Sequence, residues 1–262
     1  MRENDQLSIE IQRNVSQALA EDVGTGDLTA RLIPAGRAAT GMVTAREEAV
    51  LCGRDWFEAC LRALDPKATV AWHVAEGEWV EPDQRLCEIL SETRALLTAE
   101  RAALNFVQLL SATATITRRF VDAIAGTSAR IVDTRKTLPG LRVAQKYAVR
   151  VGGGVNHRMG LYDAVMLKEN HVRAAGSLTA AVRAARAMHP RLPLIVEVET
   201  LAQLREALDE GCTRVLVDDF DPATRREAVA IASGAPYHRR IPLEVSGGVD
   251  LQGVRAIAED GV

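Results

Sequence analysis

The sequence predicts an α/β protein: an N-terminal α/β sandwich domain followed by an incomplete, open α/β barrel of parallel strands. After residue 129, short apolar runs alternate with helical segments, which is the order of parallel strands joined by crossover helices. These runs are apolar throughout, as expected of strands covered on both faces. The first hundred residues instead contain polar-interrupted strands around turns. We therefore expect domains at residues 1–100 and 101–262.

Five strand–helix units are expected in the barrel. The predicted strands occupy residues 129–134, 163–168, 192–199, 214–219 and 242–248. The helices that follow them occupy residues 139–151, 177–188, 201–210, 222–233 and 250–260. The first domain is expected to contain strands at 40–52 and 69–90, helices at 8–20 and within 49–64, and a connecting helix at 93–124. Because the last strand would otherwise leave an open edge, we expect a C-terminal strand and tail to be absent from these residues.

The composition excludes several classes of protein. An apolar content of 47% in 262 residues supports a real core and excludes a wholly disordered chain. The net charge of −3 argues against nucleic acid as a partner. The polar N-terminus is unlike a signal peptide, and no apolar run approaches the ~20 residues of a membrane span. We expect a cytoplasmic protein with no membrane partner.

The cysteines and the isolated histidines are expected to be structural. The four cysteines show no CxxC pair and no metal-ligand spacing, so buried, reduced thiols are favoured over a metal site. They are Cys52, Cys60, Cys87 and Cys212. Three histidines lack polar companions and are predicted at the surface. They are His73, His189 and His238.

Polar residues are concentrated at the C-terminal ends of the predicted strands. In a parallel barrel these ends meet on one side, where the active site of such folds lies. The residues concerned are Asp133, Thr134, Arg135, Lys136, Lys168, Glu169, Asn170, Glu197, Glu199, Asp218, Asp219, Ser246, Gly247 and Gly248. The sequence therefore predicts one polar site built from several strand ends.

Cations gather in the part of this site that residues 133–171 supply. Arg135, Lys136, Arg158 and Lys168 lie there, with His157 beside Arg158. Arginines and lysines clustered at strand ends indicate a ligand with several negative charges, such as carboxylates, phosphates or pyrophosphate.

Carboxylates come from later, adjacent strands. Glu197 and Asp218 suit a hard divalent cation, Mg²⁺, that keeps much of its water, or a positive charge that develops on a sugar. Glu199 lies two residues from Glu197 on the same strand face, and spacing leaves open which of them functions. The turn at 246–248 offers backbone N–H groups to a phosphate. Together these features predict a phosphorylated sugar and an acidic second substrate.

Other polar residues of the same region are expected to have structural roles. The glycines at 152–154 resemble a phosphate-binding nest, but a helix C-cap with a tight turn is favoured. Lys146 and Arg150 are spaced i, i+4 on a predicted helix and are expected on a solvated face. His171 is expected to cap or to pack rather than to act in catalysis.

Seven motifs distributed along the chain resemble a known family. They are EDVGTGDLT near the start, ERAALN at residues 100–105, DTRKTLPGLR, GGGVNHRMGLYDAVMLKENH, VEVET, VDDF and EVSGGV. The chain resembles the quinolinate phosphoribosyltransferases, also called carboxylating nicotinate-nucleotide pyrophosphorylases. The resemblance implies a pentosyltransferase that joins quinolinate to phosphoribosyl pyrophosphate with Mg²⁺, giving nicotinate mononucleotide, pyrophosphate and carbon dioxide in de novo NAD biosynthesis. It also implies a homodimer with the predicted fold.

The resemblance further implies a role for individual residues. The group that would hold quinolinate is Thr134, Arg135, His157, Arg158 and Lys168. The group that would act on the phosphoribosyl moiety is Lys136 near the pyrophosphate, Glu197 and Asp218 near the ribose and the metal, directly or through water, and Ser246, Gly247 and Gly248 around the 5′-phosphate. Arg101 of one subunit would enter the site of its neighbour.

Two rival functions remain open beside this one. A related pyrophosphorylase of the molybdenum-transport type would have the same fold but act on another acidic base, and the intact HRMGLYDAVMLKENH segment argues against it. A non-enzymatic phosphosugar-binding protein would not need the carboxylates on the metal side, so their presence argues for an enzyme.

Overall fold

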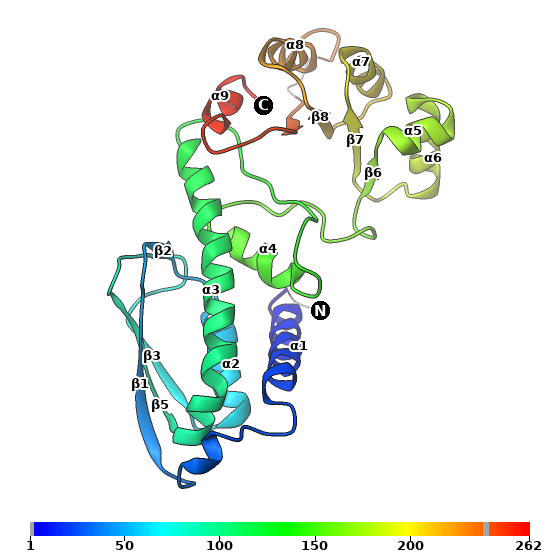
Figure 1. The fold of residues 1–262 in the computed structure, drawn as a ribbon. Helices are drawn as coiled ribbons and strands as arrows, with labels where there is room; N and C mark the ends of the chain where they lie inside the picture. The colour runs from blue at the N-terminus through cyan, green and yellow to red at the C-terminus, as the bar shows by residue number, and fades with distance from the viewer. Residues whose placement is uncertain (1–2, 238–240) are drawn as a thin grey trace. The chain divides into compact units, whose positions relative to one another are not determined.

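The computed structural model describes residues 3–237 and 241–262, so the expectation for His238 lies outside the described residues. The chain forms two compact units (Figure 1). Unit 1 comprises the residues up to Val121 together with Val132–Asn156, and unit 2 comprises Asp122–Ile131 and His157–Val262. The expected division into domains at residue 100 stays a prediction.

Unit 1 contains a small antiparallel sheet. Strand β5 (Arg85–Glu92) lies between β1 (Ala38–Thr44) and β3 (Thr69–Trp72), and a short ladder joins β2 (Ala49–Val50) to β4 (Trp79–Val80). In β5, Cys87, Ile89 and Ser91 are buried, whereas Glu88 and Leu90 between them are exposed. Such alternation is typical of a sheet with one covered face, and it confirms the predicted sandwich fold.

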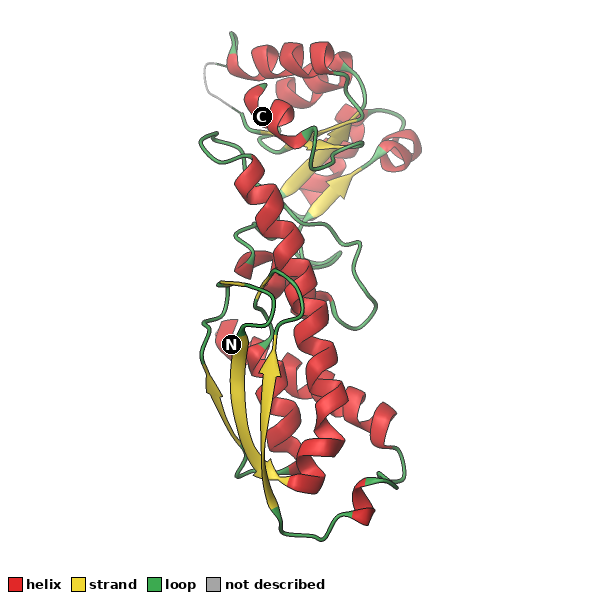
Figure 2. Cartoon of the chain, turned by 60° about the vertical axis from the view of Figure 1, so that its left-hand side comes forward, coloured by secondary structure: helices red, strands yellow, loops and turns green. Residues whose placement is uncertain are grey.

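Unit 1 also contains helical segments. They are α1 (Glu3–Val23), η1 (Ala30–Leu32), α2 (Arg54–Leu64), α3 (Thr93–Ala123) and α4 (Arg142–Val151). Figure 2 shows the strands of unit 1 in yellow beside the long red helix α3. Trp56 on α2 is fully buried, and its indole N–H donates to Asn14 Oδ1 over 3.1 Å. The interior of unit 1 is therefore one hydrophobic core in which the Trp56 indole N–H is paired.

Unit 2 is a parallel sheet with crossover helices. Its strand order is β6 (Val165–Leu167), β7 (Leu194–Val198), β8 (Val215–Asp218) and β9 (Leu243–Ser246). The helices are α5 (Glu169–Ala175), α6 (Leu178–Met188), α7 (Leu201–Asp209), α8 (Pro222–Ser233) and α9 (Val254–Glu259). Ser177, Thr200 and Asp221 cap α6, α7 and α8 by accepting backbone N–H groups of the first turn. Among the described residues, hydrogen bonds join these four strands without closing the sheet on itself, which confirms the predicted open barrel.

Two expectations about elements were wrong in detail. Residues 129–134 do not form a strand: Val132 makes a single parallel bridge with Val155, after which Asp133 turns to polar partners. The expected helix at 139–151 begins at Arg142, because Pro139 and Gly140 form a turn in which Gly140 has φ +80°. The helix α5 was not predicted from the sequence. It has only two turns, and at its start His171 Nδ1 accepts the backbone N–H of Lys168.

The cysteines behave as expected of buried thiols. All four are free and buried, and burial raises the pKa of Cys60 and Cys87 to about 12. Thiols with such pKa values are poor nucleophiles and poor metal ligands at neutral pH. Among the described helices, none combines the length and the apolar character that crossing a bilayer requires.

Candidate functional site

The parallel sheet of unit 2 has one apolar face and one polar face. The apolar face carries valines without exposed surface, which pack with the helices in one hydrophobic cluster. They are Val196, Val198, Val215 and Val217. Because side chains alternate along a strand, the residues between them point to the opposite face. That face carries Glu197, Leu216, Asp218, Glu244 and Ser246.

The strand register arranges these side chains in rows across the sheet. Glu197 lies opposite Leu216, and Leu216 lies opposite Glu244, so both glutamates stand in one row. Asp218 lies opposite Ser246, one row closer to the C-terminal ends of the strands. A two-residue step along a strand is about 7 Å. The two acids predicted from the sequence therefore share a face and differ by one row.

Lys168 and Glu197 are brought together at the ends of β6 and β7. The ammonium group of Lys168 forms an ion pair with Glu197 Oε2. The Glu197 side chain is 13% exposed, while that of Lys168 is 47% exposed. Glu199 is exposed, and its backbone N–H donates to Gln203 Oε1 at the start of α7. Position and pairing thus favour Glu197 over Glu199 as the inward-facing acid.

The turn at 246–248 interlocks with the turn after β8. Ser246 Oγ donates a hydrogen bond to Asp218 Oδ1, and the N–H of Asp219 donates to Ser246 O over 3.1 Å. Gly247 has φ +82°, and a Cβ there would lie 3.0 Å from the Asp219 nitrogen. Glycine is therefore required both by conformation and by space. The predicted phosphate turn and the predicted acid are held side by side.

A third acid on this face, Glu244, was not predicted from the sequence. Glu244 accepts a hydrogen bond on each oxygen: from Arg214 Nη2 over 2.8 Å and from His157 Nε2 over 3.0 Å. Burial raises the pKa of Glu244, but the hydrogen bonds from His157 and Arg214 outweigh burial and hold that pKa below its ordinary value. The alternation of side chains along a strand could have identified Glu244, because it precedes Ser246 by two residues and must share its face.

Two residues predicted to bind the ligand, His157 and Arg158, precede β6 in unit 2. The N–H of Arg158 donates to His157 Nδ1 over 2.8 Å. The Arg158 guanidinium contacts Ala164 O and Met166 Sδ, each over 3.4 Å. Its neighbour His157 is 8% exposed.

In unit 1, the segment after Asp133 carries the remaining predicted ligands. Arg135 is half buried, and its Nε is enclosed without a hydrogen-bond partner in the described part of the chain. An enclosed N–H without an acceptor costs about 1–3 kcal/mol, so an acceptor from a ligand would relieve this cost. Thr134 Oγ1 accepts the N–H of Lys136 over 3.0 Å, and Lys136 itself is exposed. Arg101 is exposed on α3.

The expectation that Lys146 lies on a solvated face was wrong. Its side chain is 1% exposed, and its ammonium pairs with Asp133 Oδ1. The other Asp133 oxygen accepts Asn156 Nδ2 over 2.6 Å, and Asn156 Nδ2 also donates to Lys146 O over 2.9 Å. The lysine is buried because the Val132–Val155 bridge brings Asp133 and Asn156 beside the inner face of α4. Helical spacing alone carried no sign of this partner.

The glycines at 152–154 form a helix end, as favoured, and not a phosphate nest. Their N–H groups donate in turn to the carbonyls of Ala148, Arg150 and Val149 at the end of α4. A Cβ on Gly152 would lie 2.5 Å from Ala114 O on α3. The triplet therefore allows two helices to approach closely. His171 was expected either to cap a helix or to pack. Its Nδ1 accepts the N–H of Lys168 at the start of α5, so it caps this helix.

The residues present fit Mg²⁺ only as a partly hydrated ion. Within residues 3–237 and 241–262, no three His, Cys, Asp or Glu side chains converge on one point. Glu197 and Asp218 share a face, and both carboxylates can accept hydrogen bonds from metal-bound water. Mg²⁺ is commonly held by one or two carboxylates together with substrate phosphates. The donor set therefore suits an ion that arrives with a pyrophosphate.

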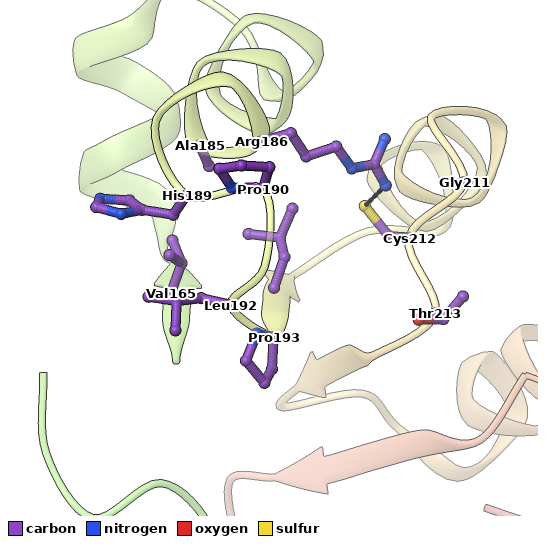
Figure 3. Close-up of a pocket in the computed structure, with 11 residues that line it drawn as sticks. Val165, Ala185, Arg186, His189, Pro190, Leu192, Pro193, Gly211, Cys212 and Thr213 are labelled. Atoms are coloured by element: carbon purple, nitrogen blue, oxygen red, sulfur yellow. Dashed lines mark hydrogen bonds between the residues drawn. The ribbon is translucent and has the colours of Figure 1, made fainter. Parts of the chain in front are cut away.

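A separate cavity lies at the opposite ends of the strands of unit 2. It has a volume of about 450 Å³ and lies between the end of α6 and the segment before β8 (Figure 3). Arg186 and Cys212 line it, and Arg186 Nη2 lies 3.8 Å from Cys212 Sγ. None of the residues predicted for the site lines this cavity. The predicted site therefore does not include this cavity.

Comparison with known protein families gives two matches that together cover most of the chain. The model of the quinolinate phosphoribosyl transferase N-terminal domain matches residues 27–111. The model of the C-terminal domain of the same family matches residues 113–262.

Individual relatives agree over nearly the full length. The carboxylating nicotinate-nucleotide pyrophosphorylase of Mycobacterium leprae (strain TN) is 44% identical over 255 residues, covering 95% of this chain and 88% of the relative. The probable enzyme of that name from Bacillus subtilis (strain 168) is 36% identical, covering 97% and 86%. The solved structure of the nicotinate-nucleotide pyrophosphorylase from Francisella tularensis has a TM-score of 0.91 at 40% identity, covering 100% of this chain and 90% of that one.

Proposed function

Because the chain belongs to the quinolinate phosphoribosyl transferase family, we propose that its polar strand ends perform the transfer for which that family is named. The chain is an enzyme, a pentosyltransferase of the carboxylating nicotinate-nucleotide pyrophosphorylase type. It transfers phosphoribosyl from phosphoribosyl pyrophosphate to quinolinate with decarboxylation, in de novo NAD biosynthesis. The match of both domain models over residues 27–111 and 113–262 carries this conclusion.

We assign the cations to the two carboxylates of quinolinate. The enclosed Nε of Arg135 supports this assignment, because it needs an acceptor. The planar, always charged guanidinium of Arg158 and the half-exposed side chain of Lys168 also support it. Each charge-assisted contact contributes about 1.5–3 kcal/mol in a partly dehydrated site. Thr134 is assigned to the same substrate.

The acids and the turn are assigned to the phosphoribosyl group. Glu197 and Asp218 would stabilise positive charge on the ribose as the bond to pyrophosphate weakens. The backbone of Ser246, Gly247 and Gly248 would hold the 5′-phosphate. Lys136 would accompany the leaving pyrophosphate. When bound, Mg²⁺ would neutralise charge on that pyrophosphate.

The reaction then needs no covalent enzyme intermediate. The quinolinate ring nitrogen forms a bond to ribose C1 while the bond from C1 to pyrophosphate breaks, and pyrophosphate leaves with the electron pair. The ring nitrogen is then positively charged, and as carbon dioxide departs the electron pair of the carbon–carboxylate bond stays on the adjacent ring carbon, where the positive nitrogen stabilises it. A proton takes the vacated ring position. This chain's task is to orient two polyanions and to exclude water.

The purified protein should form nicotinate mononucleotide from quinolinate, phosphoribosyl pyrophosphate and Mg²⁺. Chromatography of the product, with release of carbon dioxide as a second signal, measures the reaction. Nicotinate in place of quinolinate should be a poor substrate, because it lacks the second carboxylate. A chelator should stop the reaction, and added Mg²⁺ should restore it. Turnover of another acidic base but not of quinolinate would instead favour the rival pyrophosphorylase.

We further propose a homodimer in which Arg101 enters the neighbouring site. Its exposure on α3 supports this proposal. Arg101→Ala and Asp218→Asn should each be inactive alone. Mixed after reversible dissociation, they should recover about a quarter of wild-type activity, because half of randomly paired dimers contain one intact site of two. Absence of recovery in a mixture that forms mixed dimers would place Arg101 in its own subunit's site.

We place the enzyme in the cytoplasm. Four free, buried thiols support this location, because oxidising compartments favour disulfides.

A further inference from the structure

Both ring nitrogens of His157 form hydrogen bonds within the protein, and the partners of these bonds determine its tautomer. Its Nδ1 lies 2.8 Å from the backbone nitrogen of Arg158, and that nitrogen carries a hydrogen. Nδ1 must therefore offer its lone pair. The ring proton is then on Nε2, which lies 3.0 Å from Glu244 Oε2 and donates to it. A ring protonated on both nitrogens would place one N–H against another.

Hydrogen bonds to both of its oxygens fix the carboxylate of Glu244 in the position that accepts His157 Nε2. Its other oxygen accepts Arg214 Nη2 over 2.8 Å, so the carboxylate bridges an arginine and an imidazole. It stands on the polar face of the sheet in the same row as Glu197. The chain Arg214–Glu244–His157 ends at the backbone of Arg158, whose guanidinium is assigned above to quinolinate. All of these residues belong to unit 2.

We infer that Glu244 is a positioning residue of the quinolinate site. It orients His157 so that Nδ1 fixes the backbone of Arg158, and it acts on substrate only through Arg158. His157 accordingly serves as a link in this chain and not as a carboxylate-binding donor. This inference rests on the proposed function, because it assumes that Arg158 binds quinolinate.

The first test is Glu244→Gln. Glutamine keeps the length of the side chain but offers one acceptor to two donors, His157 and Arg214. The dissociation constant of quinolinate, measured by calorimetry, should rise about 10- to 100-fold, as for one lost hydrogen bond to a charged group. The constant for phosphoribosyl pyrophosphate should stay within about twofold of that of the wild type.

Glu210→Gln is the matched control. Glu210 also pairs with an arginine of unit 2, Arg183, but on the helical side of the sheet. Its substitution should leave both dissociation constants unchanged. If Glu244→Gln binds quinolinate as the wild type does, or loses affinity for phosphoribosyl pyrophosphate instead, the inference is wrong. If the wild type itself binds no quinolinate, the proposed function fails first.

Two substitutions of His157 test the link independently and remain informative should Glu244→Gln not fold. Asparagine places an amide oxygen near the position of Nδ1, where it can accept the N–H of Arg158. Glutamine reaches toward Glu244 but offers no acceptor at the Nδ1 position. His157→Asn should therefore bind quinolinate more tightly than His157→Gln. Equal or reversed affinities would contradict the role of Nδ1.

Nuclear magnetic resonance of the imidazole provides a signature that a general loss of structure would not produce. With ring-labelled histidine, the signal of His157 among five histidines is identified by its loss in His157→Asn. The wild-type signal should report a proton on Nε2, and the signal should shift in Glu244→Gln. A proton on Nδ1 in the wild type would overturn the inference.

Discussion

Replacing Arg158 by alanine should abolish measurable quinolinate binding and leave the fold intact. A guanidinium binds a carboxylate through two parallel N–H groups, and the loss of both contacts corresponds to roughly 10²- to 10⁴-fold in affinity. The Arg158 guanidinium contacts Ala164 O and Met166 Sδ, each over 3.4 Å, so the fold of the variant must be checked alongside its affinity. Calorimetry with quinolinate measures the affinity, and circular dichroism checks the fold.

A conservative variant and a control sharpen this test. Arg158→Lys keeps the charge but lacks the planar pair of donors, so its affinity should fall between those of alanine and arginine. Arg183→Ala removes an arginine of the same unit whose side chain is 71% exposed on α6, and it should bind quinolinate normally. Unchanged affinity in Arg158→Ala would remove this residue from the site.

Replacing Lys146 by methionine should destabilise unit 1 by about 3–5 kcal/mol, because it leaves the Asp133 carboxylate buried without its cation. The methionine fills much of the same volume, so the lost charge causes most of the effect. All three tryptophans, Trp56, Trp72 and Trp79, lie in unit 1. Their fluorescence during denaturation in urea therefore reports the unfolding of this unit.

The double variant Lys146→Met with Asp133→Asn separates charge from packing. Asparagine keeps an acceptor for Asn156 but carries no charge, so the double variant should be more stable than Lys146→Met alone. Lys67 of the same unit is exposed, and Lys67→Met should change the free energy of unfolding by less than about 0.5 kcal/mol. A small effect of Lys146→Met would show that the ion pair contributes little net stability.

The apolar elements of this fold were predictable because their signal is repeated along the chain. The strands that contain Val196 and Val217 are mainly apolar, and the helices after them have cap residues such as Thr200 and Asp221 at their starts. The residues 129–134 look the same in sequence. They do not form a strand because only Val132 pairs with another segment, at Val155. Such pairing depends on tertiary structure and cannot be read from the local sequence.

The polar residues divide in the same way. Glu197, Asp218 and the turn at 246–248 were predictable, because their position at strand ends is itself a sequence property. Lys146 was not, because its partner Asp133 lies on another segment and periodicity cannot supply it. Strand alternation could have predicted Glu244 on the polar face. It was missed because only residues at the ends of the strands were considered, and Glu244 lies within β9.

The rows of side chains on the polar face have a consequence for engineering. Lys168 pairs with Glu197 on the next strand. Glu244 links Arg214, the residue directly before β8, to His157 outside the sheet. A designer who wishes this enzyme to accept a different acid will meet groups of mutually dependent side chains. Libraries that randomise single positions would mostly sample broken pairs. Libraries that vary a whole row together, keeping its total charge, would sample working sites.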